Sequence, residues 1–221
     1  NTKSLENADN FLNSRGLTSH ICIECDLLLE ESFEKLLTRI SSELGRINHL
    51  VNNAAFYDSC PGWGVDFESE GYEAWIKVAK VNLLAPFFLS QKLSSLMLQQ
   101  DNASIVNISS IYGLIAPTWA LYEGTTMTNE AAYSATKGGL ISLTKWLASR
   151  LAPKIRVNVI TPGGIARDQP KKFVDKYCEA TPLNRLACEQ DIANAVRYLT
   201  SEDAKYLTGH NLVVDGGFTI T

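Results

Sequence analysis

The 221-residue sequence contains no glycine-rich phosphate-binding turn, no long uninterrupted hydrophobic run and no block of like charges. The most apolar stretch, residues 81–98, is interrupted by Asn82, Pro86, Gln91 and Lys92, so its composition is not that of a membrane span. The net charge of −4 is spread along the chain, which argues against binding to nucleic acid or an anionic membrane. We therefore expect neither among the partners.

Cysteine and histidine are too sparse and too irregularly spaced to predict a disulfide framework or a metal site. The number of cysteines is odd. Cys22 and Cys25 lie in a strand-like run, whereas a redox motif of this spacing would open a helix. His20, His49 and His210 are far apart and lack the spacing of metal ligands. We expect reduced, structural thiols in a cytoplasmic protein and no bound metal.

The hydrophobic pattern alternates between strand-like and helix-like segments along the whole chain. Strands are predicted at residues 20–26, 50–54, 104–109, 155–160 and 212–214. Helices are predicted at residues 2–15, 33–44, 72–99, 131–151 and 189–200, with a kink at Pro86 and a loop at residues 57–70. The alternation predicts an α/β fold of one domain, a doubly wound parallel sheet covered by helices on both faces.

Residues 133–137 read Tyr-Ser-Ala-Thr-Lys and supply the sequence's clearest chemical signal. Tyr133 and Lys137 are four residues apart, so on a helix they share one face. Ser110 ends an apolar strand upstream and can reach that face. Ligands of parallel α/β sheets bind at the carboxyl ends of the strands, where these residues fall. The set is suited to proton transfer in carbonyl reduction or alcohol oxidation.

Seven sequence pieces together resemble the short-chain dehydrogenase/reductase family. They are Asp26-Leu27, Asn52-Asn-Ala-Ala55, Val81-Asn82, Asn107-Ile-Ser-Ser110, Tyr133-Ser-Ala-Thr-Lys137, Pro162-Gly163 and the ending from Leu207 to Gly217. The resemblance implies a Rossmann-like domain over residues 1–221 without the family's N-terminal β-α-β segment, which carries its glycine-rich turn. In the family, those two strands lie between the segments at 20–26 and 50–54. Their loss would leave unpaired edges, so we expect the chain to be part of a longer protein.

The resemblance also implies the roles of four side chains. Tyr133 would be the general acid and base, and the Lys137 cation would lower the phenol pKa by at most about 3 units. Lys137 would also bond the hydroxyls of the nicotinamide ribose. Ser110 would orient the substrate oxygen, with Ser109 as the alternative. Asn82 would hold a water linking Lys137 to solvent, or else satisfy backbone groups near the kink.

The implied cofactor is NAD or NADP, and the resemblance extends to the residues that would bind it. Asp26 and Leu27 would flank the adenine, and the backbone around Asn53 and Ala55 would line its ribose. The remaining cofactor positions, besides Tyr133 and Lys137, are Pro162 and Ile165, the latter presenting backbone groups to the carboxamide. Two positions depart from the family pattern, which usually has Gly where Ala55 stands and often Thr where Arg167 stands.

The connection between Ser110 and Tyr133 is longer than the family usually has. Its extra residues, 119–129, include a Tyr-Glu-Gly-Thr segment that resembles a subgroup associated with bacterial flagellin modification and surface-sugar synthesis. A sugar or nucleotide-sugar is therefore the expected substrate. Arg167, Lys171 and Lys172 either suit an anionic group on it or form an ordinary solvated cluster.

Three alternatives stay open at this point. The chain is a non-catalytic relative that acts as a binding or scaffold protein, a 3-ketoacyl-type reductase, or a sugar-nucleotide epimerase or dehydratase. The last class carries a longer substrate domain than this sequence has room for. The resemblance also implies a homo-tetramer or homo-dimer, with contacts through the helices at 72–99 and 131–151 and through the last strand.

Overall fold

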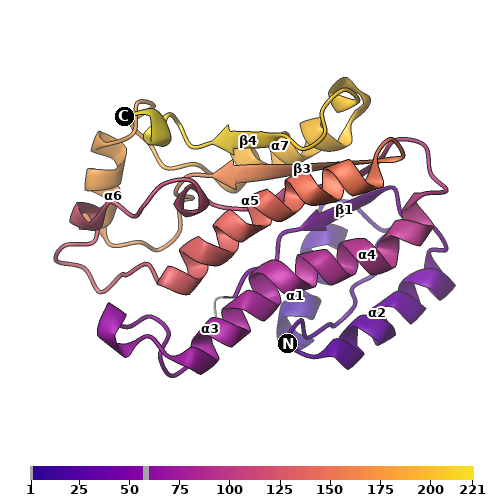
Figure 1. Cartoon of the computed structure of the whole chain (residues 1–221), viewed down its shortest axis with the longest axis horizontal. Helices are drawn as coiled ribbons and strands as arrows, with labels where there is room; N and C mark the ends of the chain where they lie inside the picture. Colours follow the sequence, from indigo (N-terminus) through magenta and orange to yellow (C-terminus); the bar gives the residue numbers. More distant parts are fainter. Residues whose placement is uncertain (1, 57–59) are drawn as a thin grey trace. The chain divides into compact units, whose positions relative to one another are not determined.

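The computed structural model (Figure 1) describes residues 2–56 and 60–221. They form two compact units, divided after Gly45. The first unit contains helices α1 (Thr2–Ser14) and α2 (Glu30–Glu43). The predicted strand at residues 20–26 is wrong, because the segment is irregular and pairs with no strand among the described residues. Alternating apolar residues form a strand only when a neighbouring strand takes up their backbone hydrogen bonds.

The second unit is built on a parallel sheet of four strands in the order β1-β2-β3-β4. The strands are β1 (His49–Asn52), β2 (Ala103–Ile108), β3 (Ile155–Pro162) and β4 (Asn211–Val214). Every residue of β2 and β3 is buried, as expected for strands covered on both faces. The predicted parallel sheet is confirmed, and its register aligns Asn52 with Asn107 and Pro162 with Val214.

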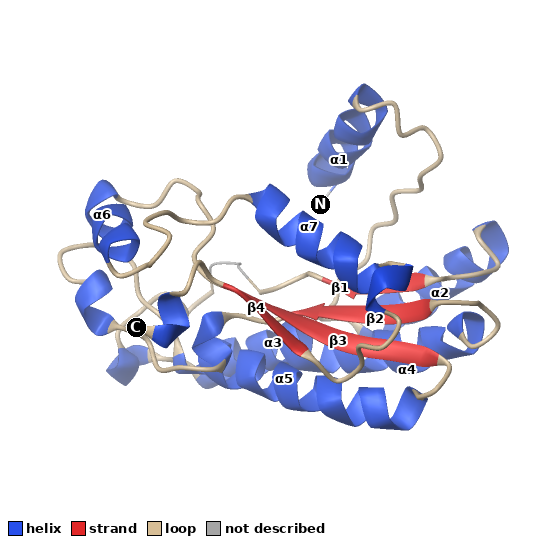
Figure 2. Ribbon diagram, turned by 90° about the horizontal axis from the view of Figure 1, so that it is seen from above, coloured by secondary structure: helices blue, strands red, loops and turns tan. Residues whose placement is uncertain are grey.

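Helices cover both faces of this sheet (Figure 2). Helices α4 (Ala85–Met97) and α5 (Ala131–Leu151) pack on one face, where Met97 and Leu147 meet Ile105. Helix α7 (Glu189–Thr200) packs on the other face, where Leu199 contacts a cluster that includes Val106. Neighbouring residues of β2 thus pack into hydrophobic clusters on opposite faces of the sheet. The predicted doubly wound α/β class is confirmed.

The long helix predicted at residues 72–99 is interrupted. It consists of α3 (Tyr72–Ala79), a π-helical turn (Lys80–Leu84) and α4. Pro86 has no N–H to donate into the helix ladder, and the wider turn takes up the mismatch immediately before it. The sequence therefore locates the irregularity correctly at Pro86, but it does not predict the π-helical turn.

Helix α6 (Lys171–Glu179) is missing from the sequence-based prediction. It is short and polar, and only Phe173 and Tyr177 are buried on its inner face. These two rings pack against the connection between β2 and α5, so a tertiary contact stabilises a segment with little helical pattern of its own. The predicted loop at 57–70 ends in a short 3-10 helix (Phe67–Ser69), and its residues 57–59 lie outside the described part.

Candidate active site

The carboxyl end of β2 is tied directly to helix α5. The Nζ of Lys137 donates to the carbonyl of Ile108 at 2.8 Å, and the Oγ of Ser109 donates to the carbonyl of Lys137 at 2.8 Å. Gly113 lets the following turn approach this point, since a Cβ there would lie 2.7 Å from the carbonyl carbon of Lys137. The Ser110 turn and the Tyr133–Lys137 face therefore meet, as the sequence predicts.

Lys137 is a buried cation beside the ring of Tyr133. Its side chain is 2% exposed, and its Nζ lies 5.7 Å from the centroid of that ring. Burial lowers the pKa of Lys137 to about 8. The ammonium group has three protons, and the Ile108 carbonyl is its one hydrogen-bond acceptor among the residues that the structure describes. It therefore keeps donors for a bound ligand and lies close enough to favour a phenolate on Tyr133.

The two candidate serines differ in how their hydroxyl groups are used. The Ser109 hydroxyl donates its proton to the Lys137 carbonyl. The Ser110 oxygen accepts from the backbone N–H of Tyr112 at 3.2 Å, and its own proton meets no acceptor in the described part of the chain. Because a hydroxyl has one proton to donate, Ser110 is the serine with a donor left for a substrate oxygen.

Asn82 lies in the π-helical turn and is 1% exposed. Its Oδ1 accepts from the backbone N–H of Phe56 at 2.8 Å, and its Nδ2 donates to the Oγ1 of Thr136 at 3.4 Å. The side chain therefore satisfies a backbone group near the kink, which is the alternative that the sequence left open. It also joins the loop after β1 to the residue that precedes Lys137. Its role in holding a water stays a prediction.

The expected cofactor-binding residues divide between the two units. Asn53 and Ala55 follow β1, Pro162 ends β3, and Ile165 follows it, so all four lie at the carboxyl edge of the sheet. The Ile165 carbonyl accepts from the Nε2 of Gln169 at 2.7 Å. Asp26 and Leu27 belong to the first unit, where the Oδ1 of Asp26 accepts from the backbone N–H of Leu28. The adenine contacts expected of Asp26 and Leu27 stay a prediction.

The long connection between β2 and α5 packs into a cluster of aromatic residues. Its buried members are Ile111, Leu121, Phe173, Tyr177 and Phe218, with Tyr112 and Tyr122 packed against them. The Tyr122 hydroxyl donates to that of Tyr112 at 2.7 Å. The sequence pattern indicates residues 119–129 as pocket residues but not Tyr112 or Tyr177. Tyr112 follows Ser110 by two residues and offered a signal, whereas Tyr177 is brought in only by the tertiary fold.

The basic residues proposed to face an anionic substrate are mostly engaged with other groups. Arg167 pairs with Glu189 at 2.6 Å, and Lys171 pairs with Asp175 at 2.6 Å. A Cβ at Gly124 would collide with the side chain of Lys172, which thus lies against that glycine. These contacts favour the ordinary charged cluster over an anion site.

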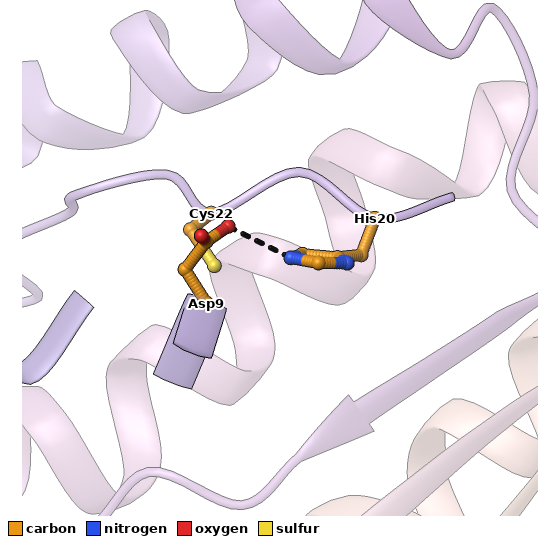
Figure 3. Close-up of side chains that lie close together, drawn as sticks. All are labelled: Asp9, His20 and Cys22. Atoms are coloured by element: carbon orange, nitrogen blue, oxygen red, sulfur yellow. Dashed lines mark hydrogen bonds and ion pairs between the residues drawn. The ribbon is translucent and has the colours of Figure 1, made fainter. Parts of the chain in front are cut away.

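One group of potential metal ligands is brought together in the first unit, although the sequence predicts no metal site. Ligand atoms of Asp9, His20 and Cys22 lie within 4.8 Å of one another (Figure 3). The His20 Nε2 lies 2.8 Å from the Asp9 Oδ1, and its Nδ1 lies 2.7 Å from the carbonyl oxygen of Leu17. The bond to Asp9 raises the pKa of His20, so a protonated imidazole with two acceptors accounts for the arrangement. We assign no metal to it.

Comparison with known proteins identifies the family. A sequence model described as enoyl-(acyl carrier protein) reductase matches residues 1–219. A short-chain dehydrogenase from Leptospira borgpetersenii, solved with bound NAD+, superposes with a TM-score of 0.79 and 34% identity over 89% of this chain and 74% of that one. The chain belongs to the short-chain dehydrogenase/reductase family. It is therefore an NAD(P)-dependent oxidoreductase by descent, and the resemblance seen in its motifs is confirmed.

Two relatives of this chain are named for different roles. The 3-oxoacyl-(acyl-carrier-protein) reductase FabG of Aquifex aeolicus is 35% identical over 215 residues, covering 95% of this chain and 80% of that protein. The post-translational flagellin modification protein A of Campylobacter coli is 30% identical over 200 residues, covering 90% of this chain and 77% of that protein.

Within the described residues, the structure contains no helix with the length and apolar character needed to cross a membrane.

Proposed function

We propose that this short-chain dehydrogenase/reductase interconverts a carbonyl and a secondary alcohol through Ser110, Tyr133, Lys137 and Asn82. The observation that carries the proposal is the buried Lys137 ammonium, 5.7 Å from the centre of the Tyr133 ring and hydrogen-bonded at the end of β2. Burying a charge costs free energy unless the charged group is paired or hydrogen-bonded. The described residues give the Lys137 ammonium one hydrogen-bond acceptor for three protons, so a bound ligand is expected to supply the others. The buried lysine therefore favours an enzyme over a non-catalytic scaffold.

The donors of this site fit a nicotinamide cofactor. Two ammonium protons of Lys137 suit the hydroxyls of a ribose, and the backbone around Asn53, Ala55 and Ile165 follows the carboxyl ends of two strands, where such ligands bind. In this proposal Pro162 helps to shape the same edge, and Asp26 and Leu27 flank the adenine. When bound, the nicotinamide supplies or accepts the hydride.

The chain's own residues manage the proton and the developing charge. In the reductive direction, Ser110 donates a hydrogen bond to the carbonyl oxygen, and Tyr133 transfers its phenolic proton to that oxygen as hydride reaches the carbon. Lys137 stabilises the phenolate that remains. Oxidation of the alcohol runs through the same steps in reverse, with the phenolate as base. Asn82 holds the turn beside Lys137 and, in this proposal, a water that returns the proton from solvent.

A sugar or nucleotide-sugar is our proposed substrate. Tyr112, Tyr122 and Tyr177 put hydroxyl groups among the aromatic residues next to the Ser110 turn, which supports a polar substrate. The similarity to a flagellin modification protein points the same way. A 3-oxoacyl thioester is the second candidate, favoured by the 35% identity to the FabG reductase.

We also propose that the protein forms a homo-dimer or homo-tetramer. The exposed rings of Phe88 on α4 and Trp146 on α5 support this proposal, because exposed apolar side chains often mark an interface.

A substrate panel tests this proposal. The full-length protein is purified and supplied with NAD+ or NADP+ and D-glucose, D-galactose or UDP-glucose, and separately with NADH or NADPH and acetoacetyl-CoA, while nicotinamide absorbance is followed. We expect oxidation of at least one sugar and little reduction of the thioester. Efficient thioester reduction without sugar oxidation would replace the sugar by the acyl substrate. Failure to bind any of the four nicotinamide cofactors in a fluorescence titration would reject the function altogether.

The two serines provide a prediction about the substrate oxygen. We expect Ser110→Ala to lower kcat by about 10²-fold or more, because it removes the donor aimed at the charge that develops on that oxygen. Ser109→Ala removes one neutral hydrogen bond to the Lys137 carbonyl, and we expect it to keep activity within about tenfold of the original. Steady-state kinetics of the two variants measure both effects. A larger loss of kcat in Ser109→Ala than in Ser110→Ala would assign the role to Ser109.

A further inference from the structure

The Tyr-Glu-Gly-Thr segment at residues 122–125 forms a turn that holds the Tyr122 side chain in place. The backbone N–H and the Oγ1 of Thr125 both donate to the Tyr122 carbonyl, at 3.0 and 2.8 Å. Gly124 has a positive φ of 72°, which a residue with a Cβ rarely adopts. The Tyr122 ring packs on Phe173 with centroids 5.5 Å apart. The glycine, the threonine and the tyrosine of the segment therefore each have a structural role.

Two hydroxyl protons beside this turn, those of Tyr112 and Tyr177, are not used in a hydrogen bond within the described part of the chain. Tyr112 and Tyr122 have two O–H protons and share a single hydrogen bond of 2.7 Å. Tyr177 is 2% exposed and accepts from the backbone N–H of Gly164 at 2.6 Å. Neither the second proton of the pair nor that of Tyr177 has an acceptor among the described residues. Hydroxyl donors that are buried, like that of Tyr177, or partly buried, like that of Tyr112, are normally satisfied, so these two protons suit a ligand rich in oxygen acceptors.

The tyrosine pair lies beside the proposed catalytic residues. The backbone N–H of Tyr112 donates to the Oγ of Ser110, and the adjacent Gly113 packs on the Lys137 backbone. Burial strongly raises the pKa of Tyr122, and the neighbouring phenols of Tyr112 and Tyr133 raise it further. The pair therefore remains neutral and protonated at physiological pH. It offers hydrogen bonds without charge, close to the site where Ser110 and Tyr133 act.

We propose that the Tyr112–Tyr122 pair binds a second, neutral oxygen of the substrate, next to the reacting carbon. This inference rests on the proposed function and narrows its substrate class to polyhydroxylated compounds. A neutral hydroxyl is favoured over a carboxylate or phosphate because the two phenols offer hydrogen bonds without charge, and because Arg167 and Lys171 are already paired with Glu189 and Asp175. A site built to bond a hydroxyl discriminates against the analogue that lacks it, because its own polar groups are then left unpaired.

Tyr122→Phe tests the proposal, with Tyr206→Phe as the matched control because Tyr206 is fully exposed. Each protein is assayed on the sugar that the original protein oxidises and on its analogue lacking the hydroxyl beside the reacting carbon; for D-glucose this is 2-deoxy-D-glucose. We expect Tyr122→Phe to lower kcat/KM for the sugar about tenfold, mainly through KM, because the Tyr112 hydroxyl, which has the free proton, loses the donor that holds it in place. The deoxy analogue and the control should show no loss.

An equal loss of kcat/KM on the sugar and on its deoxy analogue would mean that Tyr122 has only a structural role, and it would overturn the proposal. No loss on either substrate would also overturn it. Thermal unfolding of both variants is measured alongside, and if Tyr122→Phe fails to fold, Tyr112→Phe gives the same comparison through the other hydroxyl. Turnover of acetoacetyl-CoA alone by the original protein would overturn both the sugar substrate and the tyrosine site. Sugar turnover with a uniform effect of Tyr122→Phe would overturn only the latter.

Discussion

Tyr133→Phe is expected to lower kcat by about 10²–10⁴-fold, the usual contribution of a general acid and base. The variant keeps the ring beside the Lys137 ammonium, which lies 5.7 Å from the ring centroid, and removes only the hydroxyl that carries the proton. Cofactor binding should weaken by no more than about tenfold, the effect of one hydrogen bond, because Lys137 keeps its place at the Ile108 carbonyl. Single-turnover kinetics with the sugar that the protein oxidises measure the effect on the chemical step. A fluorescence titration with the cofactor measures the effect on cofactor binding.

Tyr206→Phe is the control for this variant, since it makes the same chemical change at a fully exposed position. Both variants should unfold at the temperature of the original protein within a few degrees. A Tyr133→Phe protein with more than about a tenth of the original kcat would contradict general acid–base catalysis by this residue. The proton would then have to come from another group, and Ser110 would be examined next.

Lys137→Met is expected to lower activity near neutral pH by about 10²-fold and to change its pH dependence. At the 5.7 Å that separates Nζ from the ring centre, a unit charge favours the phenolate by about 3 kcal/mol at an effective dielectric of about 20. Burial holds the pKa of Lys137 at about 8 in the free protein, so the cation is lost as pH rises through that value. The original protein's kcat/KM should therefore fall above about pH 8, and the variant should lack this decline.

Stability provides an independent measurement on the same pair of proteins. The folded-state pKa of Lys137, about 8, is below the ordinary value of 10.5, so between these values the unfolded chain binds more protons than the folded one. The free energy of unfolding should then rise with pH across this window, by about 3 kcal/mol at most, relative to Lys137→Met. Urea unfolding at both ends of the window measures the difference. An identical pH dependence in the two proteins would mean that Lys137 is not a buried cation.

The features that the sequence predicted well depend on short stretches of chain. Helix α5 begins and ends where its pattern indicates, and it puts Tyr133 and Lys137 one turn apart whatever surrounds it. The apolar runs of β2 and β3 predict buried parallel strands for the same reason. By contrast, the segment at 20–26 has a strand-like pattern and forms no strand, because pairing depends on a neighbour that the pattern does not contain.

The site shows the same division between local and non-local information. The sequence identified Ser110, Tyr133 and Lys137 as a set, but only the fold separates the two serines, since it commits the Ser109 proton to the Lys137 carbonyl. Tyr177 on α6 is brought to the Ser110 side of the molecule by packing with Phe218, a contact between residues far apart in the chain. No periodicity records such a contact.

The sequence by itself determined the α/β class, the order of the sheet-forming segments in the chain and the tyrosine–lysine pair, because these follow from hydrophobic periodicity and helical spacing. The tertiary structure alone decided which hydroxyl protons are already bonded, that a π-helical turn precedes Pro86, and that Tyr112 and Tyr122 share one hydrogen bond. Hydrogen bonding and burial depend on groups brought together from distant parts of the chain, and these are settled only when the core packs.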